Sequence, residues 1–157
     1  MIERRWIVAT LVLAACASGS AGGAGEVRPA NNPSSAVSSF LQAVSDSNLD
    51  KMAMLWGTGA GPSARTKQPP DYAQRVAIMQ AYLRHDDSRV VTDTPDAVPT
   101  QHLVQAELRR SACTWTVPFT VIQLADSSWI VKSVDITTAG NPARGCAPQA
   151  VDTTAGK

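Results

Sequence analysis

The chain has 157 residues, with 14 Lys and Arg against 13 Asp and Glu, so its formal net charge is +1. Proteins that bind nucleic acids need a basic field to displace counterions from phosphates, and no Lys/Arg cluster here is larger than the pair Arg109-Arg110. The composition therefore argues against a nucleic-acid partner, and the length suits one folded domain.

Residues 1–15 are predicted to form a secretory signal peptide. Arg4 and Arg5 precede an uncharged, mostly apolar segment over residues 6–17. About twelve residues of helix span roughly 18 Å, well short of the ~30 Å hydrocarbon core of a bilayer. Such a segment is typical of the apolar region of a signal peptide and not of a transmembrane helix.

The tetrapeptide Leu13-Ala14-Ala15-Cys16 closes this segment and resembles the lipobox of bacterial lipoproteins. The resemblance implies cleavage before Cys16 and acylation of its sulfur, as with palmitate, which would anchor the mature protein to a membrane of the cell envelope. Ala17 follows the cysteine where an acidic residue often marks inner-membrane retention. An outer-membrane location facing the periplasm is therefore expected if the organism has two membranes. The alternative is an ordinary secretory signal in which Cys16 carries no lipid.

Cys113 and Cys146 remain as an even pair once Cys16 is assigned to lipid. In an oxidising compartment they are predicted to form a disulfide. A closed loop of about 33 residues corresponds to roughly 3–4 kcal/mol in the chain-entropy model. The alternative is a metal or redox pair, which the absence of a nearby His and of a Cys-x-x-Cys motif disfavours.

The composition divides the mature chain into three parts. Residues 16–33 carry the acylated cysteine followed by small and polar residues, which are typical of a flexible tether. A folded domain is expected over residues 34–148, followed by a disordered tail over residues 149–157.

Helical periodicity predicts about three helices at the start of the domain. The first is expected to be capped by Ser34 or Ser35, the second to end at Gly57, and the third to begin near Pro70-Asp71. The glycine-rich residues 57–68 between the second and third helices predict a loop without a good strand. The apolar faces are expected to consist of Val37, Phe40, Leu41 and Val44; Leu49, Met52, Ala53 and Trp56; and Tyr72, Val76, Met79 and Leu83.

From residue 89 onward the apolar period changes to two, which indicates strands. Strands are predicted over residues 89–94, 102–109, 114–121 and 129–136, with a hairpin turn at residues 126–128. Pro118 lacks a backbone donor, so its strand is expected to lie at a sheet edge or to carry a bulge there.

Helices followed by an antiparallel meander define an α+β pattern. Residues 36–43, 48–52 and 128–135 resemble corresponding segments of the NTF2-like (SnoaL/ketosteroid-isomerase-like) superfamily, including a tryptophan, Trp129, that leads into the last strand. The resemblance implies a cone, in which about three helices pack on a curved antiparallel sheet of about four strands. One departure is the glycine-rich stretch 57–68, where many members have a short strand, and this leaves the cone mouth open on that side.

Enzymes of that superfamily place an Asp, Tyr or His inside the cone as a general acid or base. The candidates here are His102, Asp93, Asp135, Tyr72 and Tyr82, none of which lies in a motif that matches a catalytic set. His102 is expected to be a partly buried structural residue, with catalysis as the alternative. Asp135 is expected to cap the end of its strand, with an inward-facing position as the alternative. With two histidines in the chain, neither a metal site nor a cofactor is expected.

Three tryptophans, Trp56, Trp115 and Trp129, are predicted to anchor the core. Alternatively, they line a ligand pocket together with Tyr72, His102 and Asp135.

The resulting functional prediction is a non-enzymatic envelope lipoprotein that binds a small apolar ligand or a protein partner through its cone. The alternatives are an isomerase- or dehydratase-like enzyme that uses Asp135 or His102, and a purely structural lipoprotein with a filled cone. Cavity size separates these alternatives, because ligand pockets occupy about 300 Å³ or more.

Overall fold

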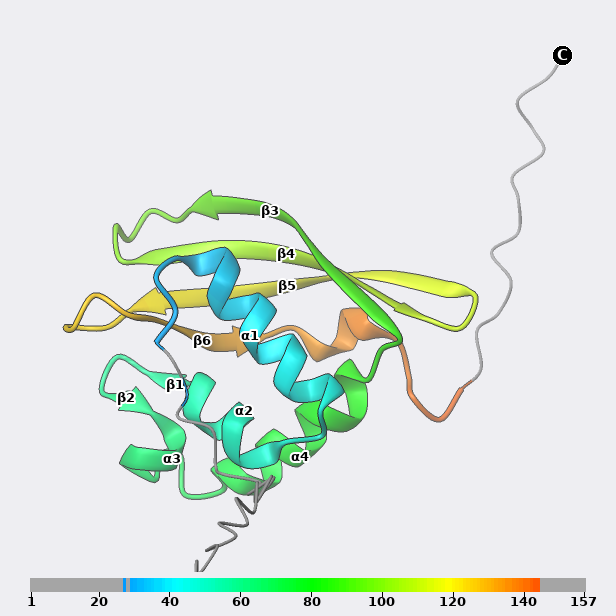
Figure 1. The fold of residues 1–157 in the computed structure, drawn as a ribbon, viewed down its shortest axis with the longest axis horizontal. Coiled ribbons are helices and arrows are strands. Elements are labelled where there is room, and N and C mark those ends of the chain that lie inside the picture. The colour runs from blue at the N-terminus through cyan, green and yellow to red at the C-terminus, as the bar shows by residue number, and fades with distance from the viewer. Residues whose placement is uncertain (1–26, 28, 145–157) are drawn as a thin grey trace, which may run out of the picture.

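A computed structural model describes residue 27 and residues 29–144, and shows helices packed on an antiparallel sheet (Figure 1). This confirms the predicted α+β class. Cys16, Cys146 and the predicted signal peptide and tail lie outside the described residues. The helices are α1 (Pro33–Ser45), α2 (Leu49–Leu55), α3 (Ser63–Thr66), α4 (Tyr72–Leu83) and the 3-10 helix η1 (Ile136–Ala139). The strands are β1 (Gly57–Thr58), β2 (Gly61–Pro62), β3 (Asp87–Pro95), β4 (Gln101–Arg110), β5 (Cys113–Gln123) and β6 (Trp129–Val134).

The main sheet is an antiparallel meander with the strand order β3-β4-β5-β6. Each edge strand carries one extra residue, Val91 in β3 and Lys132 in β6, where the pairing register shifts. Such bulges bend a strand and increase its twist. Helix α1 contacts all four strands, and α2 and α4 contact α1 (Figure 1).

Helix α1 begins earlier than predicted. Asn32, and not Ser34 or Ser35, is the N-cap: its side-chain oxygen accepts the Ser35 N–H at 2.8 Å, and the Ser35 hydroxyl accepts the Asn32 N–H at 3.3 Å. Asn is among the best N-caps, and Pro33 in the first helical position has the φ that a helix requires. The predicted apolar face of α1 is confirmed, since all four of its residues are at most 1% exposed.

The prediction of a loop without a strand over residues 57–68 is wrong. Gly57 pairs with Pro62 in a β1–β2 hairpin, helix α3 follows, and Trp56 forms a parallel bridge with Val131 of β6. A Cβ on Gly57 would collide with the Gly61 carbonyl oxygen. The glycine therefore permits close strand approach, and this hairpin covers part of the β6 edge that was expected to be open.

Pro118 lies in a central strand, so the predicted edge position is wrong. Its carbonyl accepts the Asp135 N–H at 3.1 Å. The C=O and the nitrogen of a strand residue point to the same neighbouring strand. The Pro118 nitrogen therefore faces Asp135, which follows the last residue of β6. The missing N–H of the proline thus costs the sheet no hydrogen bond within the β5–β6 ladder. The nearest bulge is on β6 opposite Thr120 and Val121, and not at the proline.

The core between α1 and the sheet is filled by large side chains. The Phe40 and Phe119 rings meet edge-to-face, with centroids 6.4 Å apart and an interplanar angle of 71°. Both are 0% exposed. Around them, and also buried, lie Val37, Val44, Met52, Leu83, Val104, Leu108, Val117 and Val121.

Candidate ligand-binding site

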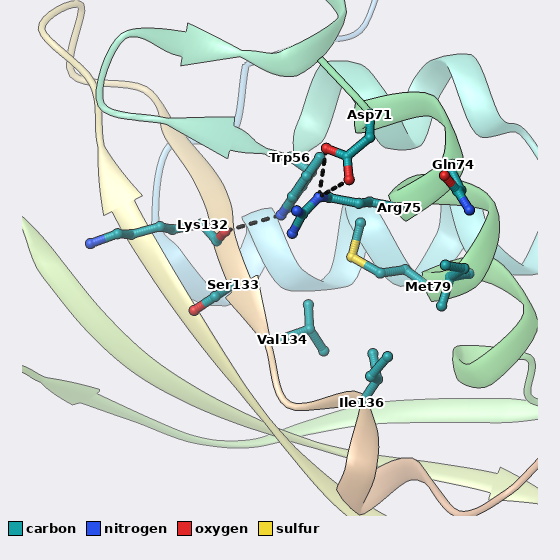
Figure 2. A pocket seen from close by; sticks show the side chains of 10 residues that line it. Trp56, Asp71, Gln74, Arg75, Met79, Lys132, Ser133, Val134 and Ile136 are labelled. Atoms are coloured by element: carbon teal, nitrogen blue, oxygen red, sulfur yellow. Dashed lines mark hydrogen bonds and ion pairs between the residues drawn. The ribbon is translucent and has the colours of Figure 1, made fainter. Parts of the chain in front are cut away.

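A cavity of about 500 Å³ lies between α4 and the end of β6, beside η1 (Figure 2). It opens to solvent and lies outside the filled core. Its lining residues come from the end of α2, from α4, from β6 and from η1: Trp56, Asp71, Gln74, Arg75, Ile78, Met79, Lys132, Ser133, Val134 and Ile136.

The cavity occupies the part of the β6 edge that other segments leave uncovered. Trp129 donates its N–H to Ala30, and Val131 bridges to Trp56. The bulge at Lys132 exposes its carbonyl, which accepts the Trp56 indole N–H at 3.0 Å. The hydrogen bond from Asp135 to Pro118 makes the next pair, Phe119 and Val134, a non-hydrogen-bonded one. The backbone N–H and C=O of Val134 consequently point away from β5, toward the cavity.

The floor of the cavity is apolar. Trp56 and Met79 are 8% and 7% exposed, and Val134 and Ile136 pack partly buried against the core. Figure 2 shows Met79, Val134 and Ile136 around one space. Ile78 also lines the cavity and is 42% exposed. The thioether of Met79 is flexible and adapts to ligands of different shape.

The rim of the cavity carries an ion pair on the first turn of α4. Arg75 Nε lies 2.9 Å from both carboxylate oxygens of Asp71. The hydrogen bond from Arg75 lowers the pKa of the Asp71 carboxyl, and the bond to Asp71 raises the pKa of the Arg75 guanidinium. Both groups therefore stay charged at neutral pH, which makes them suited to orienting a ligand and unsuited to transferring a proton.

Of the residues predicted for a pocket, Trp56 lines this cavity. Tyr72 follows Asp71 in sequence but packs partly buried against the core, with its hydroxyl 3.3 Å from Lys67 Nζ. Trp115 lies beyond the cavity lining, where the Arg110 guanidinium stacks 4.7 Å from its ring and Gly140 packs so closely that a Cβ would come within 2.6 Å of its indole nitrogen. Gly140 also has a φ of +71°, which favours glycine.

His102 and Trp129 lie together at the opposite end of β6. Their rings meet edge-to-face with centroids 5.0 Å apart. His102 Nδ1 is 2.6 Å from a carboxylate oxygen of Asp93, whose other oxygen accepts the Ser34 hydroxyl at 2.8 Å. This cluster ties the first turn of α1 to β3 and β4, and it does not line the 500 Å³ cavity.

Asp135 is exposed and caps η1, accepting the Thr137 backbone N–H at 3.1 Å and its hydroxyl at 2.6 Å. The structure therefore places Asp135 at the end of the strand and not inside the domain.

The cavity residues that the sequence did not single out for a site are Asp71, Gln74, Arg75, Ile78, Lys132, Ser133, Val134 and Ile136. Met79 was predicted only as part of an apolar helix face. Ile78 lies outside the apolar stripe of α4, but Leu49, Val91, Val98 and Leu103 are exposed to a similar extent. Because singly exposed apolar residues are common, the sequence offered no specific signal for the site.

Cys113 is disulfide-bonded. Its predicted partner, Cys146, lies outside the described residues, so that pairing stays a prediction. Over the described ranges 27 and 29–144, three or more His, Cys, Asp or Glu side chains nowhere gather as metal ligands. Within the same ranges, no helix is long and apolar enough to cross a bilayer.

No protein-family model, curated protein or solved structure matches this chain. The α+β architecture rests on the structure itself, and the NTF2-like assignment rests on the resemblance of the sequence segments.

Proposed function

We propose that the chain is a lipid-anchored protein of the bacterial cell envelope whose domain is an NTF2-like cone that binds a small apolar ligand without catalysing a reaction. The cavity between α4 and β6 is the observation that carries the proposal. Its volume of about 500 Å³ lies in the range of ligand sites and far above that of packing voids.

The order and packing of the elements support the NTF2-like assignment. Helices come first in the chain, and a four-stranded antiparallel meander with bulged edges follows. The segments that carry the sequence resemblance fall on α1, on the start of α2 and on β6. In this arrangement the interior is closed by Phe40 and Phe119, and the ligand site lies to its side, between α4 and β6.

The electrostatics of the rim favour binding over catalysis. A general acid or base works best when its pKa lies near the working pH. Asp71 and Arg75 move each other's pKa away from neutrality. The two charged groups of this pair therefore serve to hold a ligand.

An acid–base enzyme is the second candidate, because the contact between His102 and Asp93 has the form that orients a catalytic imidazole. The 500 Å³ cavity that would hold a substrate is lined by neither residue. His102→Gln is therefore expected to leave ligand binding unchanged, and an associated loss of a catalytic activity would favour the enzyme instead.

Membrane anchoring is tested through Cys16. Because acylation of its sulfur would precede cleavage, Cys16→Ala is expected to accumulate as an uncleaved precursor that lacks lipid. The measurement is intact mass together with membrane fractionation. A normally processed, membrane-bound variant would contradict the lipid anchor.

Ligand binding is tested by filling the cavity. The apolar fluorophore N-phenyl-1-naphthylamine is expected to brighten with the wild-type protein, and Val134→Phe is expected to reduce its affinity at least tenfold. Val91→Phe is the matched control, since Val91 is 46% exposed at the bulge of the opposite edge strand. Equal affinities for the two variants, or no brightening with wild type, would overturn the proposed site.

A further inference from the structure

At the rim of the α4–β6 cavity, Arg75 carries cationic donors that have no acceptor among the described residues. Arg75 uses its Nε for Asp71. Within the part of the chain that the structure describes, the two terminal amino groups of Arg75 make no hydrogen bond. A guanidinium has five N–H donors in a planar fork, so four of them remain for a ligand.

The single anionic side chain of the lining, Asp71, is occupied by Arg75 Nε. The carbonyl of the bulge residue Lys132 is occupied by the Trp56 indole. The Lys132 ammonium lies on the other side of β6, 3.0 Å from Gln101 Oε1 (Figure 2). Among the described lining residues, the Arg75 guanidinium thus has N–H groups left to donate, and no anionic side chain is unpaired. The ligand group that complements this lining is an anion.

Apolar surface lies directly beside this cationic fork. Met79, Val134 and Ile136 surround the space (Figure 2), and Ile78 of α4 belongs to the same lining. Since a water-sized group occupies about 30 Å³, a cavity of about 500 Å³ accommodates a chain on the order of ten to fifteen non-hydrogen atoms.

We infer that the ligand is a single-chain amphiphile with a carboxylate head group. The carboxylate lies against the terminal amino groups of Arg75, where a bidentate arrangement is available, and the hydrocarbon chain lies on Met79 and Val134. This inference rests on the proposed function, because it names the class of ligand for the same cavity.

Two probes that differ only in the head group test the inference: decanoate and 1-decanol, titrated calorimetrically against the wild-type domain at neutral pH. Decanoate is expected to bind about tenfold more tightly, which is the ratio that one charge-assisted hydrogen-bonded contact supports. If neither probe binds, the proposed function fails. If both bind with equal affinity, the proposed function stands and the carboxylate inference is overturned.

Variants of the ion pair sharpen the test. Arg75→Gln is expected to abolish the preference for decanoate and to leave the affinity for 1-decanol within about twofold. Because that change also leaves Asp71 as an uncompensated anion, the double variant Asp71→Asn/Arg75→Gln separates loss of attraction from new repulsion and is expected to bind both probes alike. Asp71→Asn alone removes the carboxylate charge that competes with the ligand for Arg75 and is expected to increase the preference.

The matched control is Arg89→Gln, since Arg89 is an exposed arginine paired with Glu107 on the sheet, away from the cavity. It is expected to keep the wild-type preference. A preference that survives in the double variant, or is lost equally in Arg89→Gln, would show that Arg75 does not hold the head group.

Discussion

The two sides of the helical layer differ in how completely they are filled. Where α1 meets the sheet, Phe40 and Phe119 fill the interior, and their neighbours are at most 2% exposed. Where α4 faces the end of β6, a cavity of about 500 Å³ remains. The cavity therefore lies where β6 is no longer covered by Ala30 and Trp56, and not at the deepest point of the domain.

The two sides differ because only the first half of the β6 edge is covered by other segments. Ala30 and Trp56 cover its first half, and the bulge at Lys132 directs the carbonyl to Trp56. Past the bulge, the strand contributes only the short residues Ser133 and Val134 to the lining. Figure 2 shows open space between Val134 and Met79.

The largest expected effect comes from truncating the filled side. Phe119→Ala should lower the free energy of unfolding by about 3–5 kcal/mol, because it leaves a closed void in a packed interior. Met79→Ala should cost less, about 2 kcal/mol at the lower end of the range for such truncations, because it enlarges a space that is already open to solvent. Urea denaturation measures both, and equal losses would contradict the difference between the two sides.

Enlarging a valine on each side gives the next effect. Val117→Phe should destabilise by about 2–3 kcal/mol, because Val117 is 0% exposed in the filled core and has no space for a ring. Val134→Phe should change stability by less than about 1 kcal/mol, because the ring can enter the cavity. Thermal unfolding of the two variants compares them, and a large loss for Val134→Phe would mean that the cavity is closed.

The sequence predicted the filled side of the domain better than the open side. Regular apolar periodicity predicted α1 and the strands, because Val37, Phe40 and Phe119 recur at the spacing of their elements. The role of Gly57 was misread, because close backbone approach and loop flexibility select the same residue. The bulge at Lys132 leaves no clear mark in the chain, since it is a property of pairing with β5.

The site was predictable only in part. Trp56 was named as a candidate, but Arg75 and Val134 lie far apart in the sequence. They line one cavity only because α4 packs against α2 and η1 and so lies opposite the end of β6. Their residue types are ordinary for an exposed helix turn and a strand end. A preformed cavity of this kind is space that the packed elements leave unfilled. Patterns in a single sequence do not predict where such space remains.

Removing the cap of α1 tests how firmly the filled side is anchored. Asn32→Ala should cost about 1 kcal/mol, because the Ser35 N–H loses its acceptor. Asn31→Ala is the control, since Asn31 is the adjacent exposed asparagine and does not cap the helix. Chemical denaturation should separate the two variants, and equal stabilities would contradict the assigned cap.

The smallest effect on stability is expected at the open side. The pKa of Asp71 is lowered from its ordinary value of 3.8, so the ion pair contributes stability above that value and loses it as the pH falls through the lowered pKa. Asp71→Asn should therefore be slightly less stable than wild type at neutral pH, and the difference should vanish in acid and in high salt. A difference that grows toward acid pH would reverse the sign of this linkage.

The most direct test of the account is to locate a bound probe by amide chemical shifts in ¹⁵N-labelled domain titrated with decanoate. If decanoate binds between α4 and β6, shifts are expected to concentrate in residues 71–79 and 132–136, with little change at Phe40 and Phe119. Shifts centred on the filled core or on His102, or no saturable shifts at all, would contradict the claim that the space between α4 and β6 is the ligand-binding site.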